Sequence, residues 1–217
     1  MTLSEENYLK TIYHLTSVSD AEVSTNAIAE KMETKASSVT DMLRKLSEKD
    51  WINYKKYQGV SLTEKGKLAA KMIVRKHRLW EVFLVEKLHF AWDEVHDIAE
   101  QLEHIKSEQL INKLDNFLGN PTKDPHGDPI PDSNGKIIAI EKVLLSEVLP
   151  NQKCQCVGVK DSSAAFLKYL DNNKIALGTA IKMLSEEEFD LSLKIEIDHK
   201  EMVISHKIAS NLYVKLI

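Results

Sequence analysis

The chain has 217 residues, a mass of 24.7 kDa and a formal net charge of -4, with 43% hydrophobic and 29% charged residues. Only 7 glycines and 5 prolines are present, which excludes a collagen-like, linker-like or wholly disordered chain. No stretch approaches the roughly 18 consecutive apolar residues of a membrane-spanning helix, and no basic segment leads into an apolar run at the start. We therefore expect a globular, cytoplasmic protein with no membrane partner.

The charges are distributed unevenly along the sequence. Residues 35–78 carry 12 Lys and Arg against 4 Asp and Glu, whereas residues 79–150 carry 6 against 14. A basic segment suits phosphates, and an acidic segment suits cations. The small net charge therefore does not exclude a nucleic-acid partner.

Residues 1–75 predict a winged helix-turn-helix DNA-binding domain. Apolar residues at helical spacing predict three short helices before residue 48, the second of which can be capped by Ser24 or Thr25. Residues 51–63 then predict two short strands that turn near Gly59. Three helices followed by a two-stranded wing are the arrangement of a winged helix.

The third predicted helix and the wing are the candidate DNA-reading elements. A helix can enter the major groove, about 12 Å wide, and present donors and acceptors to base edges while phosphate contacts position it. The candidate contacts to double-stranded DNA are the polar residues Ser37, Ser38, Thr40, Asp41, Arg44, Lys45, Lys55, Lys56, Tyr57 and Gln58. The alternative is a charged surface helix beside an ordinary hairpin, but the basic charge of the segment favours DNA.

The middle of the chain predicts a helical domain over residues 76–140. Helical apolar spacing extends over residues 63–88, 92–105 and 107–118. The segment 119–136 holds four of the five prolines and three of the seven glycines, which predicts a loop.

Residues 141–217 predict a small, mostly β domain. Its expected strands are residues 142–149, 153–160, 180–185, 191–197, 201–206 and 212–217, with one helix at 163–172. The only cysteines, Cys154 and Cys156, lie two residues apart in the second of these strands. The pair could form a redox or soft-metal site, or the two side chains could simply lie on the buried face of a strand. We favour the second interpretation.

Two helical segments are dense in oxygen and nitrogen ligands. They carry the patterns His77-x-x-x-Glu81 and His96-x-x-x-Glu100-x-x-Glu103-His104. Residues four apart lie on one face of a helix, so two such helices packed together could surround a divalent ion with four or five ligands. The alternative, solvent-facing polar residues of amphipathic helices, explains either pair alone but not the whole acidic cluster as well.

The sequence resembles the diphtheria-toxin-repressor family of metal-dependent transcriptional regulators, including its manganese-transport branch. The resemblance rests on the segments NYLKTIY (7–13), SSVTDMLRKL (37–46), LTEKGK (62–67), RKHRLWE (75–81), VHDIAEQLEH (95–104) and PHGDPIP (125–131). It implies a mainly α fold, in which a winged helix and a helical metal-binding and dimerisation domain precede a C-terminal SH3-like (FeoA-type) β-barrel.

The resemblance also implies two metal sites. The main site would comprise His77, Glu100, Glu103 and His104, with Asn7 reaching in from the first helix. A second site would use Glu81 with some of His96, Asp124, His126 and Asp161.

Three positions depart from parts of the family. Glu100 stands where iron-type members have Cys, and a carboxylate there favours Mn(II), with Fe(II) as the second candidate. Asn7 stands where manganese-type members usually have Asp. Lys10 stands where some of them have a carboxylate, which argues against a two-ion main site.

We therefore expect a homodimeric repressor of metal-uptake genes, not an enzyme, in which bound metal fixes the orientation of the winged helices on operator DNA. Two other classes remain open. A helical di-metal enzyme would explain the His and Glu cluster but not the basic winged segment. A winged-helix regulator of an organic ligand would explain the winged segment but not the cluster.

Overall fold

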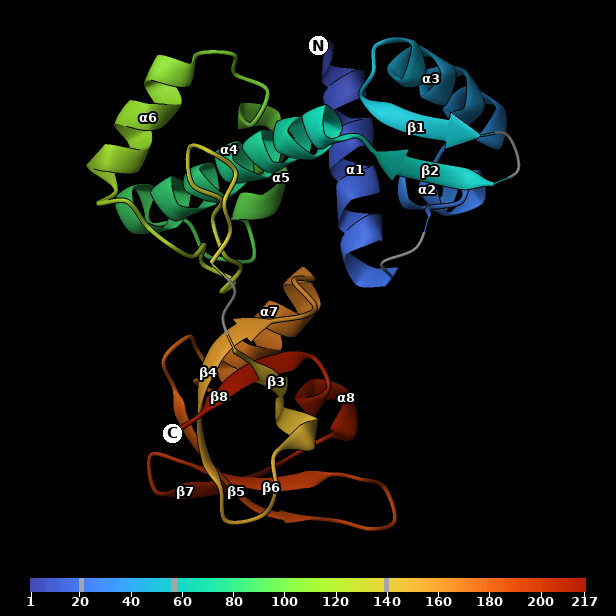
Figure 1. Cartoon of the computed structure of the whole chain (residues 1–217). Coiled ribbons are helices and arrows are strands. Elements are labelled where there is room, and N and C mark those ends of the chain that lie inside the picture. Colours follow the sequence, from blue (N-terminus) through green and yellow to red (C-terminus); the bar gives the residue numbers. More distant parts are fainter. Residues whose placement is uncertain (20–21, 56–57, 139–140) are drawn as a thin grey trace. The chain divides into compact units, whose positions relative to one another are not determined.

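The structure, a computed structural model, describes residues 1–19, 22–55, 58–138 and 141–217 (Figure 1). The chain forms two compact units, each assembled from segments that are separate in the sequence. The first unit comprises Met1–Trp80, Glu100–Leu114 and Pro131–Ile137, and the second comprises Glu81–Ala99, Asp115–Ile130 and Ile138–Ile217.

The first 80 residues have the order of a winged helix. They form α1 (Leu3–Ser19), α2 (Thr25–Lys31), α3 (Ala36–Glu48), β1 (Ile52–Lys55), β2 (Gly59–Leu62) and the beginning of α4 (Glu64–Leu88). Side-chain oxygens cap two of these helices, because Ser24 accepts the N–H of Ala27 and Thr63 accepts the N–H of Gly66. The predicted sequence of helices and wing is therefore present.

Apolar side chains at helical and strand spacing form one core in this segment. Leu9, Ile12, Ile28, Val39, Leu43 and Leu46 are fully buried. Strands β1 and β2 pair antiparallel with Lys55 opposite Gly59, and Val23 adds a further bridge to Val60. The core thereby holds α3 and the two-stranded wing in one small domain.

The middle of the chain is helical, as predicted. It contains the rest of α4, α5 (Val95–Leu102) and α6 (Glu108–Phe117). Helix α5 is shorter at both ends than the predicted segment 92–105, and it buries Val95 and Ala99. None of the described helices is both long enough and apolar enough to cross a membrane.

The C-terminal segment is an antiparallel sheet with one main helix. Its strands are β3 (Val143–Leu144), β4 (Lys153–Val159), β5 (Ala180–Glu186), β6 (Leu193–Ile197), β7 (Lys200–Ile204) and β8 (Leu212–Leu216), and its helix is α7 (Ala164–Asn172). The strand order is β3-β8-β4-β5-β6-β7, so β3 and β7 are the two ends of the sheet. In the part of the chain that the structure describes, the predicted SH3-like barrel is thus an open sheet.

Local hydrogen bonds modify two of the predicted strands. Residues 142–149 form only the short β3, followed by the 3-10 helix η1 (Leu145–Glu147), whose Glu147 carboxylate accepts the N–H of Leu144 at 3.0 Å. The last residues of the predicted strand 201–206 instead begin the short helix α8 (His206–Ala209), which Ser205 caps. Neither helix was predicted from the apolar pattern, because each is stabilised locally by a side-chain hydrogen bond at its N-terminus.

Both cysteine side chains lie in the core of the C-terminal sheet. Cys154 and Cys156 are free thiols on β4 and are buried, whereas Gln155 between them is exposed. They pack in a cluster with apolar residues that include Leu167 and Met183. This is the same-face arrangement on a buried strand that the sequence analysis favoured.

Candidate functional site

One group of ionisable side chains, called the first cluster, lies in the first unit and joins α1 to α4 and α5. It comprises Glu6, Lys10, His77, Glu103 and His104, the last two directly after α5. Glu103 is fully buried, and its Oε2 lies 2.6 Å from His77 Nδ1 and 2.7 Å from Lys10 Nζ. Burial raises the pKa of Glu103, but the hydrogen bond from His77 and the charge of Lys10 lower it by more, so the carboxylate is ionised.

Glu6 orients His104 within this cluster. Its Oε2 lies 2.6 Å from His104 Nδ1 and 3.9 Å from Lys76 Nζ. Because a carboxylate can only accept, His104 Nδ1 carries the proton and Nε2 is left as the ligand atom, 3.8 Å from Glu103 Oε1. A carboxylate on the far nitrogen is the usual support of a metal-binding histidine.

The other two residues predicted for the main site lie at the edge of the cluster. Glu100 on α5 is half exposed, and its Oε1 accepts a hydrogen bond from Lys10 Nζ at 3.3 Å. Asn7 is half-buried on α1, next to Glu6. Asn7 was a predicted ligand, whereas Glu6 was not predicted to belong to the site. Glu6 and Lys10 are four residues apart and lie on one face of α1.

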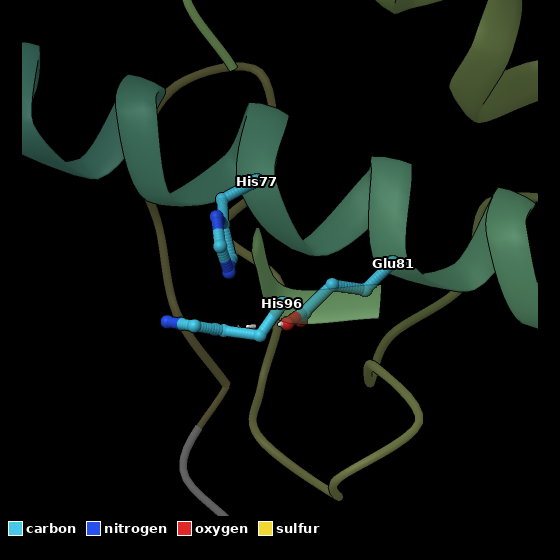
Figure 2. A group of neighbouring side chains, drawn as sticks. All are labelled: His77, Glu81 and His96. Atoms are coloured by element: carbon cyan, nitrogen blue, oxygen red, sulfur yellow. Dashed lines mark ion pairs between the residues drawn. The ribbon is translucent and has the colours of Figure 1, made fainter. Parts of the chain in front are cut away.

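A second cluster lies in the second unit. Glu81, Asp124 and His126 are all buried, and each offers a ligand atom within 4.8 Å of the others. His96 Nδ1, on a half-exposed side chain, lies 3.5 Å from Glu81 Oε1. Figure 2 shows His96 of α5 beside Glu81 of α4, together with His77 one turn earlier on the same helix.

The loop that supplies Asp124 and His126 is held by its own hydrogen bonds. Asp124 Oδ1 accepts the N–H groups of His126 and Asp128, both at 2.9 Å. His126 Nε2 must donate to the carbonyl oxygen of Trp92 at 2.9 Å, so Nδ1 faces Glu81 Oε1 at 3.7 Å. These contacts orient the donor groups of the second cluster before any ion binds.

The charges of the second cluster favour a bound cation. Burial lowers the pKa of His126, but its hydrogen bond with Glu81 and the charges of Glu81 and Asp124 raise it to about 9. Asp161, also predicted for this site, is half-buried, and its Oδ1 accepts the N–H of Ser163 at 2.8 Å. It is not among the described residues that share the 4.8 Å group.

Most of the predicted DNA-binding residues that the structure describes lie on the surface. Ser37, Ser38, Asp41, Arg44 and Lys45 of α3, and Lys55 and Gln58 of the wing, are exposed, whereas Thr40 is half-buried. Arg44 forms an exposed ion pair with Asp41 at 3.6 Å. Lys56 and Tyr57 lie outside the described residues.

A groove of about 400 Å³ adjoins these residues. It lies between the N-terminal part of α2, α3 and the wing, and two predicted DNA-binding residues, Thr40 and Gln58, line it. Three residues that were not among the predicted DNA contacts, Thr25, Asn26 and Tyr54, also line it. The sequence predicted a helix cap just before α2, but it did not predict that the N-terminus of α2 lies near α3.

A winged helix joined to clustered carboxylates and imidazoles defines a metal-dependent DNA-binding regulator. Family models agree with this class. "Iron dependent repressor, N-terminal DNA binding domain" matches residues 1–60, "Iron dependent repressor, metal binding and dimerisation domain" matches residues 63–132, and "FeoA domain" matches residues 143–216. The chain belongs to the diphtheria-toxin-repressor family of metal-dependent transcriptional repressors.

Individual relatives include both iron- and manganese-type proteins. The chain is 35% identical over 126 residues to the iron-dependent repressor IdeR of Mycobacterium tuberculosis, and the aligned segment covers 58% of this chain and 54% of that protein. It is 35% identical over 117 residues to the HTH-type transcriptional regulator MntR of Oceanobacillus iheyensis, which covers 54% and 78%. The solved structure "Manganese-dependent transcriptional repressor complex with manganese" superimposes with a TM-score of 0.87 at 33% identity, covering 98% of this chain and 100% of that chain.

Proposed function

We propose that the chain is a homodimeric repressor that binds operator DNA when Mn(II) occupies the main site, with Fe(II) as the second candidate ion. The observation that carries the proposal is the contact of α1 with the first cluster. Leu9 and Ile12 of α1 belong to the core of the winged helix, while Glu6 and Lys10 of the same helix contact His104 and Glu103. A movement of the side chains in the first cluster would therefore act directly on α1, which is part of the DNA-binding domain.

The donor set suits the proposed ions. The main site would be held by His77, Glu100, Glu103 and His104, with Asn7 from α1 and with Glu6 fixing the tautomer of His104. Nitrogen and carboxylate oxygen are the ligands of Mn(II) and Fe(II), whereas softer ions prefer thiolates, and both thiols are buried in the C-terminal sheet. A bound divalent ion supplies positive charge that draws these side chains together.

The second site would comprise Glu81, Asp124 and His126, with His96 and Asp161 as further candidate ligands. The closeness and burial of the first three support this set. The structure supports His96 through its contact with Glu81. Asp161 remains a proposal from the resemblance alone.

The proposed mechanism is a restriction of geometry. In a two-fold dimer, the orientation of α1 relative to the dimerisation helices sets the separation of the two α3 helices, which must match half-sites about 34 Å apart or a multiple of that distance. A chain that samples many orientations binds operator with an affinity reduced by the competent fraction. The dimer is proposed from the matched dimerisation family model, and a purely monomeric chain in analytical ultracentrifugation would contradict it.

The test is operator binding at one stated salt concentration with Mn(II), Fe(II), Zn(II) or Co(II), using a duplex selected from a random pool in the presence of Mn(II). We expect Mn(II) to raise the affinity at least about tenfold, in the range of typical allosteric coupling, and DNA to raise the affinity for Mn(II) by the same factor. Glu103→Gln should lose this response, whereas Glu188→Gln, on an exposed residue, should keep it. Operator affinity that no metal changes would overturn the proposal and favour an organic ligand, and metal-dependent turnover of a substrate would favour an enzyme.

A further inference from the structure

Lys10 occupies the space between two carboxylates of the proposed main site. Its Nζ lies 2.7 Å and 2.9 Å from the two carboxylate oxygens of Glu103 and 3.3 Å from Glu100 Oε1. The lysine side chain is only 12% exposed, and Glu103 is fully buried. One ammonium group therefore contacts three oxygen atoms that a divalent ion would also use.

The ammonium group and a divalent ion compete for these oxygens. Each carboxylate oxygen keeps a second lone pair when it accepts a hydrogen bond from Nζ, but two cations a few ångströms apart in a buried site repel each other strongly. Displacing Lys10 from Glu103 therefore costs free energy that lowers the affinity for metal. The cost is larger than for a surface ion pair because Glu103 is buried.

We propose that Lys10 is a tethered competitor of the metal: it neutralises Glu103 and Glu100 in the metal-free chain and withdraws when a divalent ion binds. The inference rests on the proposed function, because it concerns the main site. Lys10 belongs to α1, so metal binding would replace the direct contact of Lys10 with Glu103 by a link between α1 and Glu103 through the metal ion. A monovalent ion would gain little over the ammonium group, so the exchange favours divalent ions.

Lys76 provides a matched control. Its side chain is similarly buried, at 15% exposed, and its Nζ lies 3.9 Å from Glu6 Oε2. Lys76→Met also removes one largely buried positive charge next to the first cluster, but it frees no proposed ligand oxygen of Glu103 or Glu100. Comparing Lys10→Met with Lys76→Met thus separates direct competition from a general effect of charge.

The main experiment measures Mn(II) affinity by isothermal titration calorimetry at one pH and one salt concentration. We expect Lys10→Met to bind Mn(II) about tenfold more tightly than the unchanged chain, which corresponds to about 1.4 kcal/mol. Lys10→Arg should stay close to the unchanged chain, and Lys76→Met should change the affinity by less than about threefold. Lys10→Met with unchanged or weaker affinity, or an equal gain in Lys76→Met, would overturn the inference.

A second measurement needs no variant and decides the question if Lys10→Met fails to fold. Acetylation of lysine amines, followed by mass spectrometry, reports how accessible each Nζ is. Labelling of Lys10 should rise several-fold when Mn(II) saturates the unchanged chain, and unchanged or lower labelling would contradict the inference. If the unchanged chain binds no divalent ion, the proposed function fails as well; if it binds Mn(II) and responds on DNA but Lys10→Met is no tighter, only this inference fails.

Discussion

Two histidines of the candidate sites are oriented by acceptors that belong to the chain itself. Glu6 accepts from His104 Nδ1, and the carbonyl oxygen of Trp92 accepts from His126 Nε2. The contact at His104 leaves Nε2 as its ligand atom. His126, whose pKa is raised to about 9, also carries a proton on Nδ1 at neutral pH, and this proton must leave before Nδ1 can bind an ion. Both imidazoles are thus held in place before an ion binds.

Glu6→Gln tests this orientation at the main site. We expect the affinity for Mn(II) to fall by about tenfold or more, as for other residues that support a metal ligand, because the amide carries no charge to hold the His104 N–H. Calorimetric titration measures the change. The control is Glu5→Gln on the adjacent residue, which pairs with Lys49 and should lower stability while leaving metal affinity nearly unchanged. Equal losses in both variants would show that Glu6 has no specific role.

The buried thiols give a pH-dependent prediction. Burial raises the pKa of Cys154 and of Cys156 to about 11, so both remain protonated at pH 8. We expect a thiol reagent such as Ellman's reagent to leave the native chain unmodified at pH 8 and to react with two thiols after denaturation. Because the unfolded chain ionises nearer pH 9, stability should fall as the pH rises from about 9 to about 11. Rapid reaction of the native chain at pH 8 would contradict this burial.

At the scale of elements, the loop that supplies the second cluster is fixed to β4 by close backbone contact. Val159 N donates to the carbonyl oxygen of His126 at 2.9 Å. Gly127, at φ +88°, lies so close to the strand that a Cβ there would meet the carbonyl oxygen of Val157 at 2.1 Å. Only glycine fits both the conformation and the space.

Gly127→Ala should therefore displace the loop. We expect a loss of about 3 kcal/mol in the free energy of unfolding, from the left-handed conformation together with the steric clash, and a lower affinity at the second site. Gly119→Ala is the matched control, because its φ is +78° but no atom lies within 4 Å of the added Cβ. It should cost only about 1 kcal/mol. Denaturant unfolding measures both variants, and similar losses would contradict the close approach.

Strong periodicity made most elements predictable from the sequence. Leu43 and Leu46 of α3 and the alternation of Cys154 and Cys156 on β4 follow the simple rules of helices and strands. The short helices η1 and α8 were not predicted, because single side-chain caps outweigh the apolar pattern there.

The candidate sites were predictable only in part. The His and Glu spacing indicated most of the proposed ligands. The contacts of Glu6 and Lys10 were not predictable, because they depend on which face of α1 meets the residues that follow α5.

At the scale of the whole molecule, basic and acidic residues are concentrated in different segments, which the small net charge does not reveal. The segment 35–78 includes α3, the wing and the first part of α4, and it is followed in the sequence by an acidic segment, residues 79–150, that holds most of the proposed metal ligands. Binding to DNA should therefore depend strongly on salt although the chain is acidic overall.

Lys45→Gln tests this dependence. The residue is exposed on α3, and if it contacts a phosphate, the slope of log affinity against log salt concentration should become shallower by about 0.9. Lys200→Gln, an exposed lysine of β7, is the control and should leave the slope unchanged. Fluorescence anisotropy over a series of salt concentrations measures both. Equal slopes in all three proteins would remove Lys45 from the DNA interface.

Because the 124–128 loop is attached to β4, the geometry of the second cluster depends on the C-terminal sheet, whereas all members of the first cluster precede that sheet in the sequence. A protein that ends after residue 138 would keep every member of the first cluster and would also keep Glu81, Asp124 and His126. It would lose the strand whose backbone holds that loop in place. The C-terminal sheet thus holds the loop of the second cluster, so its removal should weaken cation binding at the second cluster and leave the contacts of α1 with Glu103 and His104 unchanged.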